Sequence, residues 1–167
     1  LIAAMNPCRC GFFRSTKCRC PIESVRDYRN RISGPLMDRI DIHIEVPAVP
    51  YRKLKTTTRG ESSQKIRARV QAARNIQRER FSDCELHSNA QMGPTHLRHH
   101  CQVDEKGHDL LEMVVDRLGM SARAYDRILK VARTIADLAQ SPKIEVAHLS
   151  EAIQYRSLDR QLGRSQA

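Results

Sequence analysis

The sequence of 167 residues has no long apolar run and no complete nucleotide-binding motif. No stretch approaches the roughly 20 apolar residues that a membrane-spanning helix needs, and no signal-peptide pattern is present, so we expect a cytoplasmic protein that enters no membrane. The phosphate-binding pattern Gly-x-x-x-x-Gly-Lys-Ser/Thr is missing, and so is an acidic strand end that would hold Mg²⁺. We therefore expect that this chain alone does not hydrolyse a nucleoside triphosphate.

Positive charge is concentrated in the first half of the sequence. Residues 1–81 contain 18 Lys and Arg against 7 Asp and Glu, whereas residues 82–167 contain 11 against 12. This asymmetry predicts that the first half meets a polyanion, which could be nucleic acid, nucleotide phosphates or an acidic neighbouring subunit. A generally basic surface without a specific partner would give the same balance.

Four of the six cysteines form two Cys-x-Cys pairs near the start of the chain, where a disulfide framework is not expected. Four thiolates at this spacing can hold one tetrahedral ion, and Zn²⁺ is the preferred ion for a closed sulfur site. The alternative is a loop with four free thiols. We expect a structural zinc site at Cys8, Cys10, Cys18 and Cys20.

The hydrophobic pattern predicts a mainly α chain with strands only at its beginning. Residues 1–5 are all apolar, which is typical of a strand that is covered on both faces. Residues 40–46 alternate between apolar and polar side chains, which is typical of a strand with one face in the core. The Lys- and Thr-rich stretch 51–60 is typical of a linker, and the polar residues 161–167 are typical of a frayed tail. Helical spacing and capping residues predict helices over residues 21–32, 61–81, 94–101, 104–118, 121–139 and 144–155.

The predicted helix after residue 61 has basic side chains on most of its circumference. They form either a solvated face or a surface that contacts DNA phosphates or a neighbouring subunit. The His-rich stretch 96–101 is less suited to a second metal ion, because adjacent histidines on a helix point in different directions. The basic residues that we expect to contact nucleic acid are Lys65, Arg67, Arg69 and Arg74.

Four motifs, spread over almost the whole chain, resemble those of the magnesium-chelatase-like AAA+ ATPases of bacteria, specifically the ComM/YifB type. The resemblance implies that residues 1–50 are the end of an α/β nucleotide-binding core that contributes two strands and a helix, and that residues 61–160 are a helical lid. We expect a piece of a longer protein, because the sequence begins inside a predicted strand. The motifs are Ala4-Met5-Asn6-Pro7-Cys8, Ser33-Gly34-Pro35-Leu36-Met37-Asp38-Arg39-Ile40-Asp41, Ser121-Ala122-Arg123-Ala124-Tyr125 and Glu151-Ala152-Ile153-Gln154-Tyr155-Arg156-Ser157-Leu158-Asp159-Arg160.

The resemblance also implies roles for three polar residues. Asn6 would be the sensor-1 residue that orients the attacking water, and Arg39 would be the arginine finger that reaches a neighbouring subunit's nucleotide. Arg123 would be the sensor-2 residue on the γ-phosphate, acting in cis as Asn6 does. From the residues alone, Asn6 is a turn residue and Arg39 is an ion-pair partner of a flanking carboxylate, whereas Arg123 lies at a predicted helix N-terminus, where an anion can dock.

The implied function is that of an ATP- and Mg²⁺-dependent DNA motor, a hexameric ring of the branch-migrating helicase type. One alternative is a magnesium-chelatase-like subunit, in which the same ATPase drives metal insertion into a tetrapyrrole and needs no basic DNA surface. Another alternative is a zinc-stapled nucleic-acid-binding module without motor function.

Overall fold

The computed structural model describes residues 1–49, 51, 55 and 60–156. The prediction of a mainly α chain is confirmed, and within these residues no strand is present and no helix is long and apolar enough to cross a membrane. Most of the linker and the whole predicted tail lie outside the described residues. The helices are α1 (Ile22–Arg29), α2 (Gly34–Arg39), α4 (Ser63–Arg80), the 3₁₀ turn η1 (Asn89–Gln91), α5 (Pro94–His100), α6 (Glu105–Leu118), α7 (Ala122–Leu138) and α8 (Val146–Gln154).

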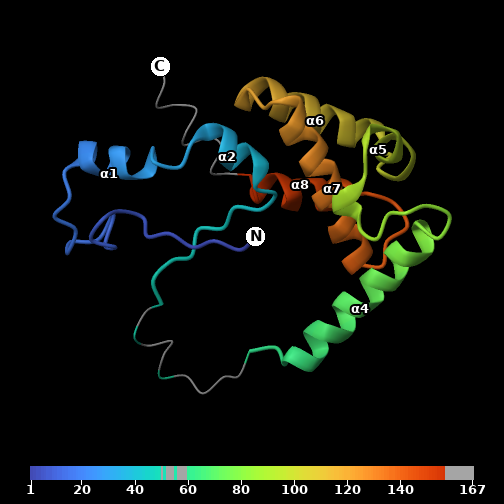
Figure 1. The fold of residues 1–167 in the computed structure, drawn as a ribbon, viewed down its shortest axis with the longest axis horizontal. Coiled ribbons are helices and arrows are strands. Elements are labelled where there is room, and N and C mark those ends of the chain that lie inside the picture. Colours follow the sequence, from blue (N-terminus) through green and yellow to red (C-terminus); the bar gives the residue numbers. More distant parts are fainter. Residues whose placement is uncertain (50, 52–54, 56–59, 157–167) are drawn as a thin grey trace.

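The hydrophobic core lies in the second half of the chain, around α7. This helix contacts α2, α4, α5, α8 and η1, and Figure 1 shows α8 crossing it at the centre of the molecule. Leu111, Ile128 and Leu149 are among the fully buried side chains of the core. Truncating any one of them to Ala would cost about 2–5 kcal/mol of stability, because a cavity would remain.

Helix boundaries in this half follow the capping residues of the sequence. Ser62, Asp104 and Ser121 each accept a hydrogen bond from a backbone N–H in the first turn of α4, α6 and α7 respectively. Gly119 ends α6 with a φ of 59°, the left-handed conformation that suits glycine. These caps satisfy backbone groups that a helix end otherwise leaves open.

A buried carboxylate joins three elements of the core. Asp137 of α7 is fully buried and accepts hydrogen bonds from Arg80 at 2.7 and 2.5 Å, from Asn89 at 2.8 Å and from Arg133 at 3.1 Å. Arg133 also donates to the carbonyl of Ser141 at 2.6 Å. The guanidinium of Arg133 therefore compensates the buried charge of Asp137 and does not lie on the surface of its helix.

The first half of the chain differs most from the prediction. Residues 1–5 and 40–46 form no ladder, and the apolar side chains of Leu1 and Ile2 are fully exposed. A strand depends on hydrogen bonds to neighbouring strands, and no such neighbour is present among the described residues. Ser33, which directly follows the predicted helix over residues 21–32, caps the start of α2 by accepting from Leu36 N at 3.3 Å.

The apolar side chains of α4 are only partly buried. Ala73 lies in the interior, but Ile66 and Val70 are exposed because the first turns of α4 extend away from the core (Figure 1). The basic N-terminal part of α4 is therefore accessible on most of its circumference.

Candidate functional site

Arg39 is the last residue of α2 and its side chain is exposed. Its Nη1 donates to the carbonyl of Pro35, one turn earlier, at 2.8 Å. The helix ends here because Ile40 has an extended backbone, with φ −85° and ψ 128°. A guanidinium has five N–H donors, so the bond to Pro35 leaves donors for a phosphate.

The two carboxylates that flank Arg39 are bound by residues distant in sequence. Asp38 accepts a hydrogen bond from the Ser121 hydroxyl at 3.0 Å, and its Oδ1 lies 3.6 Å from Nη2 of Arg156. Asp41 forms an ion pair with Arg127. None of the described contacts joins Arg39 to either carboxylate, so the geometry favours an arginine that is available to a ligand.

Arg123 lies in the first turn of α7, two residues after the capping Ser121, and is exposed. The bond between Ser121 and Asp38 therefore holds together the two segments from which Arg39 and Arg123 project. Figure 1 shows α2 beside the helices of the second half. Sequence spacing gives no sign of this proximity, because 83 residues separate the two bonded side chains.

Asn6 lies at the start of the cysteine loop and is exposed. Gly11, with a φ of 81°, lies next to it: a Cβ at this glycine would be in ordinary van der Waals contact with Cγ of Asn6, at 3.9 Å. The next residue, Pro7, accepts a hydrogen bond from Arg29 Nε at 3.0 Å, which ties this segment to α1. Within the described part of the chain, no contact joins Asn6 to the two arginines.

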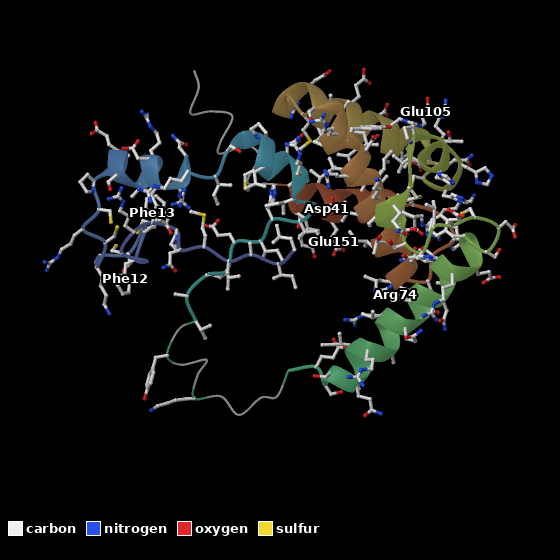
Figure 2. The ribbon with its side chains drawn as sticks, in the orientation of Figure 1. Phe12, Phe13, Asp41, Arg74, Glu105 and Glu151 are labelled. Carbon is white, nitrogen blue, oxygen red and sulfur yellow. The ribbon has the colours of Figure 1, made fainter. Side chains whose placement is uncertain are left out.

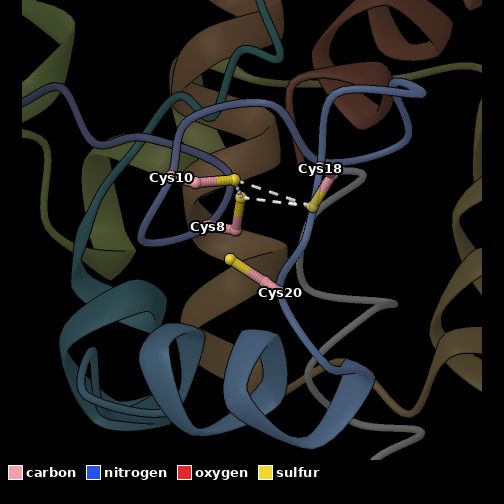
Figure 3. Close-up of side chains that lie close together, drawn as sticks. All are labelled: Cys8, Cys10, Cys18 and Cys20. Carbon is pink, nitrogen blue, oxygen red and sulfur yellow. Dashed lines mark hydrogen bonds between the residues drawn. The ribbon is translucent and has the colours of Figure 1, made fainter.

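The four predicted cysteine ligands converge (Figure 3). Their sulfur atoms all lie within 4.8 Å of one another, with Cys8 3.4 Å from Cys10 and 3.9 Å from Cys18. A tetrahedral zinc ion with Zn–S bonds of about 2.3 Å requires sulfur separations of about 3.8 Å. The residues present therefore fit a closed zinc site, with Cys20 completing the set.

The pKa values of the cluster diverge. Hydrogen bonds from the Phe12 backbone and then from the Cys8 thiol lower the pKa of Cys10 to about 6, and the thiolate is the form that binds metal. At Cys18 a backbone hydrogen bond at Cys20 is outweighed by burial and the neighbouring Cys10, which raise the pKa of Cys18 to about 11, so Cys10 is the thiol that most readily loses its proton. The guanidinium carbon of Arg29 lies 4.4 Å from the centre of the Phe13 ring, a cation–π contact that attaches the loop to α1. Phe12 remains half exposed on the same loop, where Figure 2 labels both aromatic residues.

The basic residues predicted on α4 differ in their availability. Lys65, Arg67 and Arg74 are exposed, and Figure 2 shows Arg74 on α4, away from the cysteine loop. Arg69 donates two hydrogen bonds to Glu61, at 3.1 and 3.2 Å. Three of the four predicted residues are thus accessible to a phosphate backbone, whereas Arg69 would first have to leave its carboxylate partner.

Two family models match the chain. Residues 60–156 match the model described as magnesium chelatase, subunit ChlI C-terminal, and residues 1–54 match the model described as magnesium chelatase, subunit ChlI. Together they cover most of the chain and leave residues 55–59 of the predicted linker between them.

Curated relatives cover nearly the whole chain. Competence protein ComM of Haemophilus influenzae is 42% identical over 163 residues, which are 97% of this chain and 31% of that protein. Uncharacterized protein YifB of Escherichia coli is also 42% identical over 163 residues. Uncharacterized protein Rv2897c of Mycobacterium tuberculosis is 30% identical over 156 residues. The chain spans about a third of the length of these relatives.

Proposed function

Since the chain belongs to the family described as magnesium chelatase, subunit ChlI C-terminal, we propose that it forms part of an AAA+ ATPase that works as a hexameric ring and supplies phosphate-facing arginines to it. The observation that carries this proposal is the bond between Asp38 and Ser121, which holds together the segments of two exposed arginines. Guanidinium groups meet phosphate oxygens with a planar fork of donors and stabilise the charge of the transferring phosphoryl group.

Arg39 and Arg123 of one subunit act on the same nucleotide, the one bound by the neighbouring subunit. An arginine finger projects toward the neighbour's nucleotide and away from its own. Because Ser121 is bonded to Asp38, the chain segments that carry Arg123 and Arg39 are joined two residues and one residue away from these arginines, which supports a role in trans for both in place of the cis role first expected for Arg123. ATP and Mg²⁺ would be held by motifs that this sequence lacks.

Rings assembled from two different variants of the full-length protein distinguish a trans role of Arg123 from a cis role. Rings mixed from Arg39→Ala and Arg123→Ala subunits stay inactive if both arginines act in trans, because every neighbour lacks one of them. Recovered ATP turnover would instead place Arg123 in cis. As a control for mixing, the doubly substituted subunit combined with one that cannot bind nucleotide should recover turnover. Arg39→Ala alone should lower kcat by about 10³-fold or more, and an unchanged kcat would overturn the finger role.

The four cysteines hold a structural Zn²⁺ that fixes the loop from Cys8 to Cys20. Zinc supplies no chemistry to hydrolysis in this arrangement, since four thiolates leave no open position. The purified protein should contain about one zinc per chain, as expected for a single four-cysteine site, and Cys8→Ser with Cys18→Ser should lose it. The matched control is Cys84→Ser, an exposed cysteine outside the cluster, which should retain the metal.

The partner of this ATPase is DNA. The basic first half of the chain and the exposed cations of α4 support this proposal, because such surfaces bind phosphate backbones independently of sequence. ATP turnover that rises with branched or single-stranded DNA, while nucleotide binding is unchanged, is the expected result. Turnover indifferent to DNA would favour the alternative of ATP-driven metal insertion.

A further inference from the structure

We propose that Asp38 and Asp41, held by Arg156 and Arg127, are positioning residues that attach the end of α2 to the second half of the chain and keep Arg39 free for its phosphate. This inference rests on the proposed function, because it explains how the finger keeps its charge and direction. It gives Asp38 and Asp41 a role other than the ion pair with Arg39 that the sequence alone indicated.

The arrangement solves an electrostatic conflict in the sequence Asp38-Arg39-Ile40-Asp41. A carboxylate within about 4 Å of the guanidinium would neutralise it and would also repel a triphosphate. The structure gives each carboxylate another cation: Asp38 has Arg156 and the Ser121 hydroxyl, and Asp41 has Arg127. Arg39 keeps only the neutral carbonyl of Pro35 among the described contacts.

Arg156 is the inner anchor of this arrangement. Its side chain is 1% exposed, and its Nη1 donates to the carbonyl of Ile40 at 2.5 Å. A guanidinium so far from water requires compensating acceptors, which the residues beside Arg39 supply. The backbone N–H of His43 adds a bond of 2.8 Å to the carbonyl of Tyr155, so the same segment is fixed on both sides of Asp41.

Arg127 and Asp41 form the outer pair, which is more accessible. Their side chains are 25% and 52% exposed, so water screens the pair and its loss should not unfold the chain. The pair joins the two segments that carry the phosphate-facing arginines, because Arg127 lies one turn beyond Arg123 on α7 and Asp41 lies two residues beyond Arg39. A break in the pair therefore loosens the finger segment relative to the helix that carries the second phosphate-facing arginine.

The test measures ATP turnover of the full-length protein with Asp41→Asn, with Arg127→Gln, and with the exchanged pair Asp41→Arg/Arg127→Asp. Each single substitution should lower kcat by about tenfold while KM changes little, because misplacement of a group that acts in the transition state lowers kcat. The exchanged pair should restore most of the kcat that each single substitution loses. Arg98→Gln, on the exposed face of α5, is the matched control and should leave kcat unchanged.

Each outcome decides between the positioning role and its rivals. Single variants with normal kcat, while Arg39→Ala is inactive, would overturn the positioning role and leave the proposed function intact. A lower melting temperature with normal kcat would also overturn it, since the pair would then be only structural. A low kcat in the single variants that the exchanged pair does not restore would also overturn the positioning role. Normal turnover in Arg39→Ala would instead overturn the proposed function itself.

Discussion

The hydroxyl of Ser121 makes one bond within its own helix and another to Asp38, 83 residues away. It accepts from the backbone N–H of Ala124 at 3.2 Å, which caps α7, and it donates to the Asp38 carboxylate at 3.0 Å. One side chain thus caps the start of α7 and joins that helix to the segment of Arg39. A cap that would otherwise only stabilise a helix also orients two parts of the candidate phosphate site.

Ser121→Ala should lower both stability and activity. Loss of the cap should reduce the free energy of unfolding by about 1 kcal/mol, measured by urea denaturation, and loss of the bond to Asp38 should reduce ATP turnover of the full-length protein. Ser62→Ala is the matched control, because Ser62 caps the exposed start of α4 and accepts from Lys65 N at 3.4 Å. It should lower stability and leave turnover unchanged; equal turnover in the two variants would contradict the dual role of Ser121.

Asp137→Ala should strongly destabilise the second half of the chain. The substitution leaves Arg80 and Arg133 with an uncompensated buried charge, which costs about 3–5 kcal/mol. Asp116→Asn, an exposed carboxylate on α6, should change the free energy of unfolding by less than about 0.5 kcal/mol. Equal denaturation midpoints for the two variants would show that the buried network contributes little.

Alkaline pH should weaken the fold through Cys101. Burial raises the pKa of this thiol from 9.0 to about 11, so the folded chain keeps the proton over a range in which the unfolded chain releases it. The free energy of unfolding should therefore fall between pH 9 and about 11. The fall should be smaller in Cys101→Ala. An identical pH slope in the two proteins would exclude Cys101 as the cause.

Neutralising the exposed cations of α4 should weaken DNA binding. The triple variant Lys65→Gln/Arg67→Gln/Arg74→Gln should bind DNA less tightly and with a shallower salt dependence, by about 0.9 in the log–log slope for each phosphate that is no longer neutralised. The control triple variant replaces the exposed Arg98, Lys106 and Arg117 of α5 and α6 by Gln, which removes the same charge. It should bind DNA as tightly as the unmodified protein does. If both triple variants bind DNA equally tightly, α4 is not the DNA surface.

The sequence by itself determined the local features of this protein. Ser62, Asp104, Ser121 and Gly119 fix helix ends through bonds to their own neighbours, and the apolar period fixes the buried face of α7. The four-cysteine loop was equally visible, because all four cysteines lie within 13 residues of one another and their sulfur atoms converge. Such features depend on contacts over one or two turns of chain, which a linear pattern records.

Only the tertiary structure decided which charged side chains form ion pairs and which remain available to a ligand. Arg80 and Arg127 both look like surface cations in the sequence, yet one pairs with the buried Asp137, 57 residues away, and the other with Asp41, 86 residues away. The two predicted strands did not form among the described residues, because a strand is completed by hydrogen bonds from other segments. Contacts between segments that are distant in the sequence arise from packing, and no local period of the sequence encodes them.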